Sequence, residues 1–177
     1  MKKKSCLAGY ERCGTFNLYL VKYRLFWYNL TMVQPETLQK YSLFGGLMEE
    51  QIASIFPLMQ HEDFDSDEFI ITEGKPNDKI YFLIEGHVEV SKRDMVLTKF
   101  GEGEAFGEME VLDVSSAIAS IKSLSPVKVL SISNKSLREI YKIDVKIFSL
   151  MILNLARDLC RRLRKMDEKI APSNIFI

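Results

Sequence analysis

Residues 80–90, IYFLIEGHVEV, contain two short apolar runs separated by Glu85 and Gly86. After the glycine, apolar and polar residues alternate through Val88 and Val90, which is typical of a strand with one face in water. A glycine between two such runs permits the tight turn that joins antiparallel strands. This stretch therefore predicts two short strands joined by a turn at the glycine.

Similar apolar runs lie on both sides of this stretch, at residues 69–72, 95–100, 118–121 and 127–132. Turn-forming residues separate them, as in GKPND at 74–78 and GEG at 101–103. Many short strands at even spacing indicate a sandwich or a small barrel. The sequence thus predicts a mainly β fold with flanking helices.

Helical periodicity flanks the strands. Residues 48–60 have apolar residues at helical spacing and predict an amphipathic helix, although Pro57 lies near its end. Residues 143–169 contain neither glycine nor proline and predict a long helix. Its apolar stripe repeats in steps of four and three, as a heptad seam does: Ile152, Ala156, Leu159, Leu163, Met166 and Ile170. The seam predicts a homodimer interface, and the alternative is a helix packed on its own barrel.

Charge divides the chain of 177 residues into unlike parts. Residues 1–31 hold six basic and one acidic residue, net +5, and residues 157–177 hold six and three, net +3. Between them, residues 32–156 hold twelve and twenty, net −8. An acidic body disfavours nucleic acid, and the basic residues 157–169 are interpreted as a solvated helix face, with a phosphate-contacting patch as the alternative. Three cysteines without a paired spacing indicate a reducing cytoplasm.

The predicted organisation has three parts. Residues 1–33 form an N-terminal extension, residues 34–142 a barrel domain with N-terminal helices, and residues 143–170 the dimerisation helix. Residues 16–30 are apolar but interrupted by Lys22 and Arg24, too short a run to span a bilayer. They suit an interfacial helix of a membrane-peripheral adaptor, or else the extension is disordered, packs as an extra helix, or is not translated.

No arrangement of residues predicts catalysis or metal binding. Asp63, Asp65 and Asp67 begin like a calcium loop, but Glu68 and Gly74 stand where such a loop needs glycine and glutamate. The two histidines are isolated, and no nucleophile lies in a recognisable motif with a base. We therefore predict a non-enzymatic protein without a metal site.

The order of four motifs resembles the cyclic-nucleotide-binding domain of catabolite activator protein and protein kinase A regulatory subunits. They are EGKPND at 73–78, the hairpin at 80–90, FGEG at 100–103 and FGEM at 106–109. The resemblance covers residues 40–169. It implies an eight-stranded double-stranded β-helix, or jelly-roll barrel, with N-terminal helices and a long C-terminal helix.

The resemblance also implies a phosphate-binding cassette that begins at FGEM. In it Gly107 would allow close approach of the phosphate, and Glu108 would accept the ribose 2′-hydroxyl. The candidate ligand residues are those at the cassette's two ends: Gly107, Glu108, Met109, Glu110, Val111, Ala117 and Ile118. In the family, ligand in the barrel repositions a hinge helix and the long helix, and the hinge here would fall within residues 136–144.

Two positions depart from the family pattern. The arginine that pairs with the cyclic phosphate stands nine residues after the glutamate, where this chain has Ala117. Moreover, Glu110 adds a carboxylate where the family has a small residue. Losing a charge-assisted pair to a desolvated phosphate costs about 2–5 kcal/mol, so a cyclic nucleotide is a disfavoured ligand. Three explanations stay open: a relic site, a different uncharged or cationic ligand, or a cation supplied from elsewhere.

These observations predict a dimeric, cytoplasmic regulatory module whose cyclic-nucleotide binding is weakened, altered or lost, with an unknown protein partner. The alternatives are a genuine cyclic AMP sensor, a transcription-regulator relative without its DNA-binding domain, and a membrane-peripheral adaptor. The chain ends eight residues after Lys169. Because a helix-turn-helix core needs about 20 residues, specific DNA binding is not expected, and neither is membrane binding.

Overall fold

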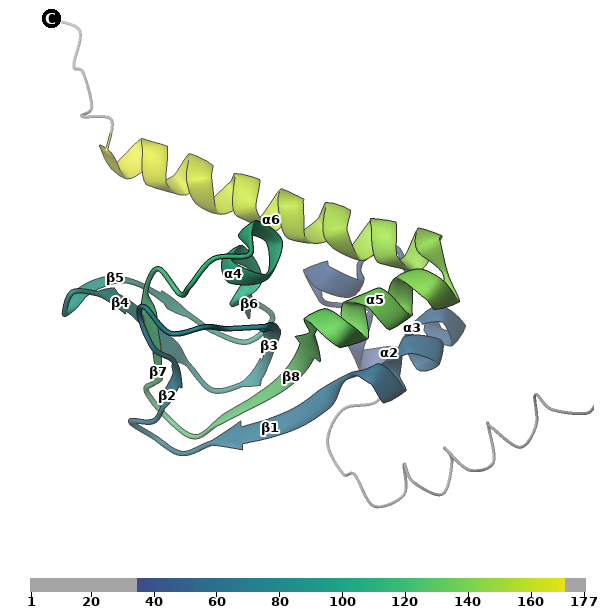
Figure 1. Cartoon of the computed structure of the whole chain (residues 1–177), viewed down its shortest axis with the longest axis horizontal. Helices are drawn as coiled ribbons and strands as arrows, with labels where there is room; N and C mark the ends of the chain where they lie inside the picture. Colours follow the sequence, from purple (N-terminus) through teal and green to yellow (C-terminus); the bar gives the residue numbers. More distant parts are fainter. Residues whose placement is uncertain (1–34, 171–177) are drawn as a thin grey trace, which may run out of the picture. The chain divides into compact units, whose positions relative to one another are not determined.

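Two antiparallel sheets of four strands each form the body of the protein, described by a computed structural model over residues 35–170 (Figure 1). One sheet has the strand order β1-β8-β3-β6 and the other β2-β7-β4-β5. The strands are β1 Gln60–Phe64, β2 Phe69–Ile71, β3 Lys79–Glu85, β4 Val88–Lys92, β5 Met95–Phe100, β6 Ala105–Phe106, β7 Ser120–Ser123 and β8 Val127–Ser133. The mainly β jelly-roll fold with flanking helices, predicted from the sequence, is confirmed.

Strands form on both sides of Gly86, but the expected hairpin is wrong, because β3 and β4 lie in different sheets and do not pair with each other. Strand β3 pairs with β8 in one sheet, and β4 pairs with β5 and β7 in the other. Gly86 makes the turn with a φ of +94°, and a Cβ there would lie only 2.4 Å from the carbonyl oxygen of Pro126. A side chain at this position would therefore clash with backbone, which is why the turn needs glycine.

An apolar core fills the space between the sheets. Its buried members come from both sheets and from the segment before β7: Ile71, Tyr81, Leu83, Val88, Val90, Phe106, Ala117, Ala119, Ile121, Val127 and Val129. The rings of Tyr81 and Phe106 stack with their centres 5.2 Å apart. Burial raises the pKa of Tyr81 to about 12, as expected for a phenol in a dry interior.

Helical segments flank the sheets. They are α2 Pro35–Leu38, η1 Ser42–Phe44, α3 Glu49–Ile55, η2 Phe56–Leu58, α4 Glu108–Asp113, α5 Asn134–Ile143 and α6 Val145–Ile170. The helix predicted over residues 48–60 is thus shorter: Pro57 lies in the 3₁₀ turn η2, and β1 begins at Gln60. Strand β1 was not predicted because its sequence, QHEDF, is polar on both faces.

The long helix α6 packs along α5 and η1 (Figure 1). Its buried face consists of Ile147, Met151 and Leu155, at helical spacing. The predicted heptad stripe lies on a different side, where Leu163, Met166 and Ile170 are exposed. Over residues 35–170, no helix combines the length and the apolar character that a bilayer crossing requires. The expectations for residues 1–33 lie outside the described residues.

Candidate functional site

Gly107 begins the cassette in a left-handed backbone conformation, with φ at +77°. A Cβ at this position would lie 2.7 Å from the Lys79 carbonyl oxygen and 2.9 Å from Asn77 Nδ2. Asn77 Nδ2 also donates hydrogen bonds to the carbonyl oxygens of Lys79, at 2.8 Å, and Gly107, at 3.3 Å. The packing of α4 against the start of β3 therefore already requires glycine here.

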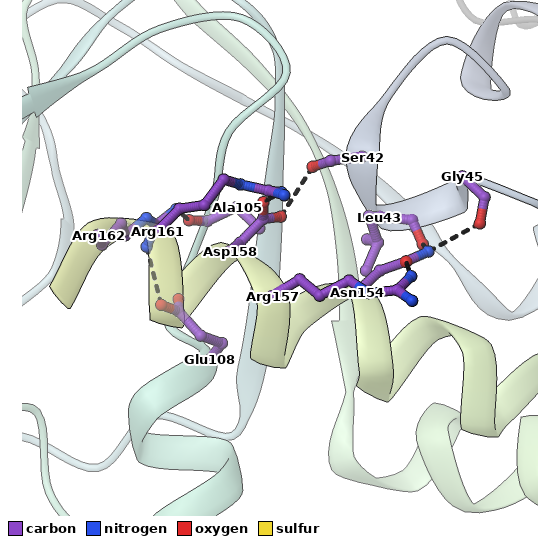
Figure 2. A network of polar contacts seen from close by, with 10 residues as sticks. All are labelled: Ser42, Leu43, Gly45, Ala105, Glu108, Asn154, Arg157, Asp158, Arg161 and Arg162. Carbon is purple, nitrogen blue, oxygen red and sulfur yellow. Dashed lines mark hydrogen bonds and ion pairs between the residues drawn. The ribbon is translucent and has the colours of Figure 1, made fainter. Parts of the chain in front are cut away.

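Glu108, the next residue, is buried and paired with an arginine from α6. Arg162 Nη1 donates to Glu108 Oε1 at 2.8 Å, and Nη2 donates to the carbonyl oxygen of Ala105. The guanidinium carbon also lies 4.4 Å from the centre of the Phe100 ring, a cation–π contact. Figure 2 shows Arg162 reaching from α6 to Glu108 and Ala105. One side chain thus joins α6 to α4 and to β6.

The electrostatics of this pair reflect burial. Desolvation raises the pKa of the Glu108 carboxyl, the Arg162 charge opposes that shift, and the nearby Glu110 carboxylate adds to it. The Glu108 side chain is only 4% exposed and that of Arg162 is 24% exposed. The pair is therefore a largely desolvated one, in which removing either partner leaves an uncompensated buried charge.

The far end of the cassette is joined to the turn between β2 and β3. The N–H of Ala117 donates to the Lys75 carbonyl oxygen at 2.9 Å, and the N–H of Gly74 donates to the Ala117 carbonyl oxygen at 2.7 Å. The Ala117 methyl group belongs to the apolar core described above. Glu110 is buried and its Oε1 accepts the Ile118 N–H at 3.4 Å. The residue that stands nine positions after Glu108, where the sequence comparison above expects the family arginine, is thus small, buried and apolar.

The seven candidate ligand residues divide by burial. Gly107, Glu108, Glu110, Val111 and Ala117 are buried, and Met109 and Ile118 are exposed. Sequence reasoning did not single out Arg162, which it placed in a solvated basic segment. A signal was present, because Arg162 follows Leu155 by seven residues and so continues the buried stripe of α6 rather than the heptad seam.

A second set of contacts fastens α6 near its middle (Figure 2). Asn154 Nδ2 donates to the carbonyl oxygens of Leu43, at 3.1 Å, and Gly45, at 2.9 Å. Ser42 Oγ donates to Asp158 Oδ2 at 2.8 Å. Helix α6 is therefore held at two places, by η1 and the residues next to it and by α4 of the cassette. A movement of α4 would thus be transmitted to α6 and from there to η1.

Comparison with known proteins identifies the same family that the sequence motifs resemble. Residues 61–144 match the sequence profile of the cyclic nucleotide-binding domain. The CRP-like cAMP-activated global transcriptional regulator of Mycobacterium tuberculosis is 28% identical over 141 residues, which are 77% of this chain and 61% of that protein. The cAMP-dependent protein kinase regulatory subunit of Yarrowia lipolytica is 32% identical over 116 residues, 63% of this chain and 31% of that protein. The chain thus spans less than two thirds of either relative.

Solved structures with a similar fold come from the same family. A cyclic nucleotide-binding domain from Methylobacillus flagellatus superposes with a TM-score of 0.70 at 26% identity, over 78% of this chain and 81% of that one. The catabolite activator protein of Thermus thermophilus superposes with a TM-score of 0.64 at 25% identity, over 73% and 61%.

Proposed function

Residues 61–144 belong to the cyclic-nucleotide-binding domain family, and we propose that the chain is a non-enzymatic regulatory module in which cyclic-nucleotide binding is weakened, altered or lost. In this proposal residues 34–142 are the barrel domain and residues 143–170 a dimerisation helix. The protein works as a cytoplasmic homodimer that binds neither a specific DNA sequence nor a membrane. The observation that carries the proposal is the alanine at position 117.

Ala117 cannot replace the guanidinium that a cyclic phosphate needs. The phosphate is a monoanion, and a buried anion without a paired cation is costly. The one guanidinium that reaches the cassette, among residues 35–170, is that of Arg162, and it already binds Glu108. A phosphate at Arg162 would compete with Glu108 for the guanidinium, whereas the Glu108 carboxylate has further lone pairs that would accept a ribose hydroxyl without loss of the pair.

Regulation in this proposal passes through α6. Ligand or partner binding near α4 would weaken the Arg162 contact and favour a second position of α5 and α6, as in a two-state switch. The chain between these helices is short, since α5 ends at Ile143 and α6 begins at Val145. The exposed heptad stripe, with Leu163, Met166 and Ile170, supports dimerisation along α6.

Isothermal titration with cyclic AMP tests the proposal directly. We expect no binding tighter than about 10 µM. If thermal unfolding shows that Ala117→Arg keeps the fold despite the burial of this position, we expect it to strengthen binding by about 30-fold or more, because it restores the charge-assisted pair. Ala117→Met is the control of similar length without charge, and it should leave binding weak. A wild-type dissociation constant below about 10 µM would contradict the proposal.

One observation favours an alternative, a genuine cyclic-nucleotide sensor that uses Arg162 as its cation. The guanidinium lies beside Glu108, where a ligand's ribose and phosphate would meet the cassette. If the wild type binds tightly, Arg162→Ala should abolish binding and Arg162→Lys should retain part of it, because lysine keeps the charge. Equal binding by all three proteins would exclude a role for Arg162.

A further inference from the structure

Glu110 is a buried carboxylate without a paired cation. It lies in α4, two residues after Glu108, and is 7% exposed. Within residues 35–170, the ion pair of the cassette joins Arg162 to Glu108, and Glu110 takes part in no ion pair. Because burial of an unpaired carboxylate costs free energy, a position that keeps one is a candidate for a functional role.

The segment that closes the cassette is folded around Glu110. The backbone carbonyl oxygen of this residue accepts the N–H groups of Val114 and of Ser115, the latter at 3.3 Å. Its side-chain Oε1 accepts the N–H of Ile118 at 3.4 Å, which is a long hydrogen bond. The Glu110 side chain therefore reaches from α4 to the far end of the cassette.

The Ile118 N–H is a donor that an anionic ligand would need. It directly follows Ala117, where the family spacing expects the arginine that pairs with the cyclic phosphate, and the N–H of Ala117 itself already donates to the Lys75 carbonyl oxygen at 2.9 Å. Glu110 thus supplies an anion of the protein's own to the Ile118 donor. Burial raises the pKa of Glu108 and the Glu110 charge adds to that shift, so this charge acts on both ends of the cassette.

We propose that Glu110 is a specificity-determining residue that makes the cassette reject anionic ligands. Its carboxylate accepts the Ile118 N–H in place of a phosphate oxygen, and a phosphate brought to that donor would meet a like charge in a poorly solvated position. A ligand that is neutral there meets no such repulsion. Its hydroxyl or N–H groups would donate to the lone pairs of the carboxylate that Ile118 leaves free.

This inference rests on the proposed function and adds a second cause to it. The alanine at position 117 removes an attraction for the phosphate, whereas Glu110 adds a repulsion, so the two act separately. Ala117→Arg should therefore recover only part of the affinity for cyclic AMP, and Glu110→Gln should recover a further part, whether it is made alone or in that background.

The test compares cyclic AMP with adenosine, which lacks the phosphate, by ¹⁵N–¹H NMR titration of the full chain up to millimolar ligand. Glu110→Gln removes the charge but keeps an oxygen that accepts the Ile118 N–H, and thermal unfolding checks that the variant keeps the fold. We expect this variant to bind cyclic AMP at least about tenfold more tightly than the wild type does. Its affinity for adenosine should stay within about threefold of the wild-type value, because adenosine brings no charge to the site.

The matched control is Glu104→Gln. Glu104 is a half-buried carboxylate of the same segment, and its Oε2 also accepts a backbone N–H, that of Gly101 at 2.9 Å. It lies before the cassette and does not reach Ile118. This variant should change the affinity for either ligand by no more than about threefold.

Three results would overturn the proposal. The first is an affinity for cyclic AMP that Glu110→Gln leaves unchanged, or no binding of cyclic AMP by either protein. The second is an equal gain for adenosine, which would give Glu110 a structural role only, and the third is an equal gain from Glu104→Gln, which would indicate a general charge effect. A wild-type dissociation constant for cyclic AMP below about 10 µM would contradict the proposed function alone, because Glu110→Gln would still be expected to tighten that binding.

Discussion

The two sides of α6 differ in what they contact. One side is fixed to its own domain by Ile147, Met151 and Leu155, and by the polar anchors Asn154 and Arg162. The other side carries the heptad stripe, where Leu163 is 61% exposed, Met166 56% and Ile170 74%. The contrast shows that apolar residues at good heptad spacing need not be the residues through which a helix packs on its own domain.

The largest expected effect lies on the buried side. Leu155→Ala should lower the free energy of unfolding by about 2–5 kcal/mol, because it removes buried methyl groups and leaves a cavity. Leu163→Ala, the matched change on the exposed side, should cost less than about 1 kcal/mol in dilute protein. Urea denaturation measures both. Equal costs would mean that the two sides do not differ as the structure has them.

An intermediate effect is expected where the buried side meets the cassette. Arg162→Ala should lower the free energy of unfolding by about 2 kcal/mol near neutral pH, because it leaves the Glu108 carboxylate buried without its cation. Glu108 has a folded-state pKa above its ordinary 4.5, owing to burial. Its contribution to stability is therefore fully present below that value and is lost as the pH rises through the folded-state pKa.

Removing the Arg162 charge, the larger of the two influences that oppose the shift, should raise the pKa of Glu108 further, so the cost of Arg162→Ala should be larger at about pH 7.5 than at about pH 5. Urea denaturation at the two pH values measures it. In a background of Glu108→Gln, which cannot ionise, the cost of Arg162→Ala should no longer depend on pH. A cost that stays the same at both pH values in the wild-type background would count against a buried, ionised Glu108.

The smallest effect on stability is expected on the exposed side. Met166→Glu should change the free energy of unfolding of the isolated chain by less than about 0.5 kcal/mol, since it replaces a solvated side chain. It should nevertheless dissociate a homodimer that uses the heptad stripe, because it places a charge in the seam. Sedimentation velocity measures whether the protein is a monomer or a dimer. The control is Lys165→Glu, a change at a neighbouring residue that does not belong to the heptad stripe. A dimer that survives Met166→Glu would place the interface elsewhere.

Much of the fold could be predicted from local pattern. The apolar run at residues 95–100 coincides with β5, and strands form on both sides of Gly86, although they pair with other strands and not with each other. Strand β1 was missed because a polar edge strand, QHEDF, has no apolar alternation to reveal it. It forms because β8 offers it a hydrogen-bonding partner from Val127 to Ser131.

The candidate site was predictable only in part. The motif around Gly107 and Glu108 identified the cassette, and the family spacing pointed to Ala117. Arg162 was missed because the heptad seam led us to expect the functional side of α6 along the stripe, and Arg162 lies on a different side of the helix. The backbone conformation of Val114 could not be predicted either. This residue is left-handed, with φ at +55°, which is uncommon for a β-branched residue, and no sequence pattern indicates it.

The amino-acid sequence by itself determined most of the strands and turns, the glycine at 107 and the lack of arginine at 117, because these depend on residue type and near-neighbour spacing. Only the tertiary structure decided which charge meets Glu108. Arg162 lies 54 residues further along the chain, and helical geometry together with the packing of α6 on η1 and α5 brings it there. Partners so far apart are set by how elements pack, which no local pattern encodes.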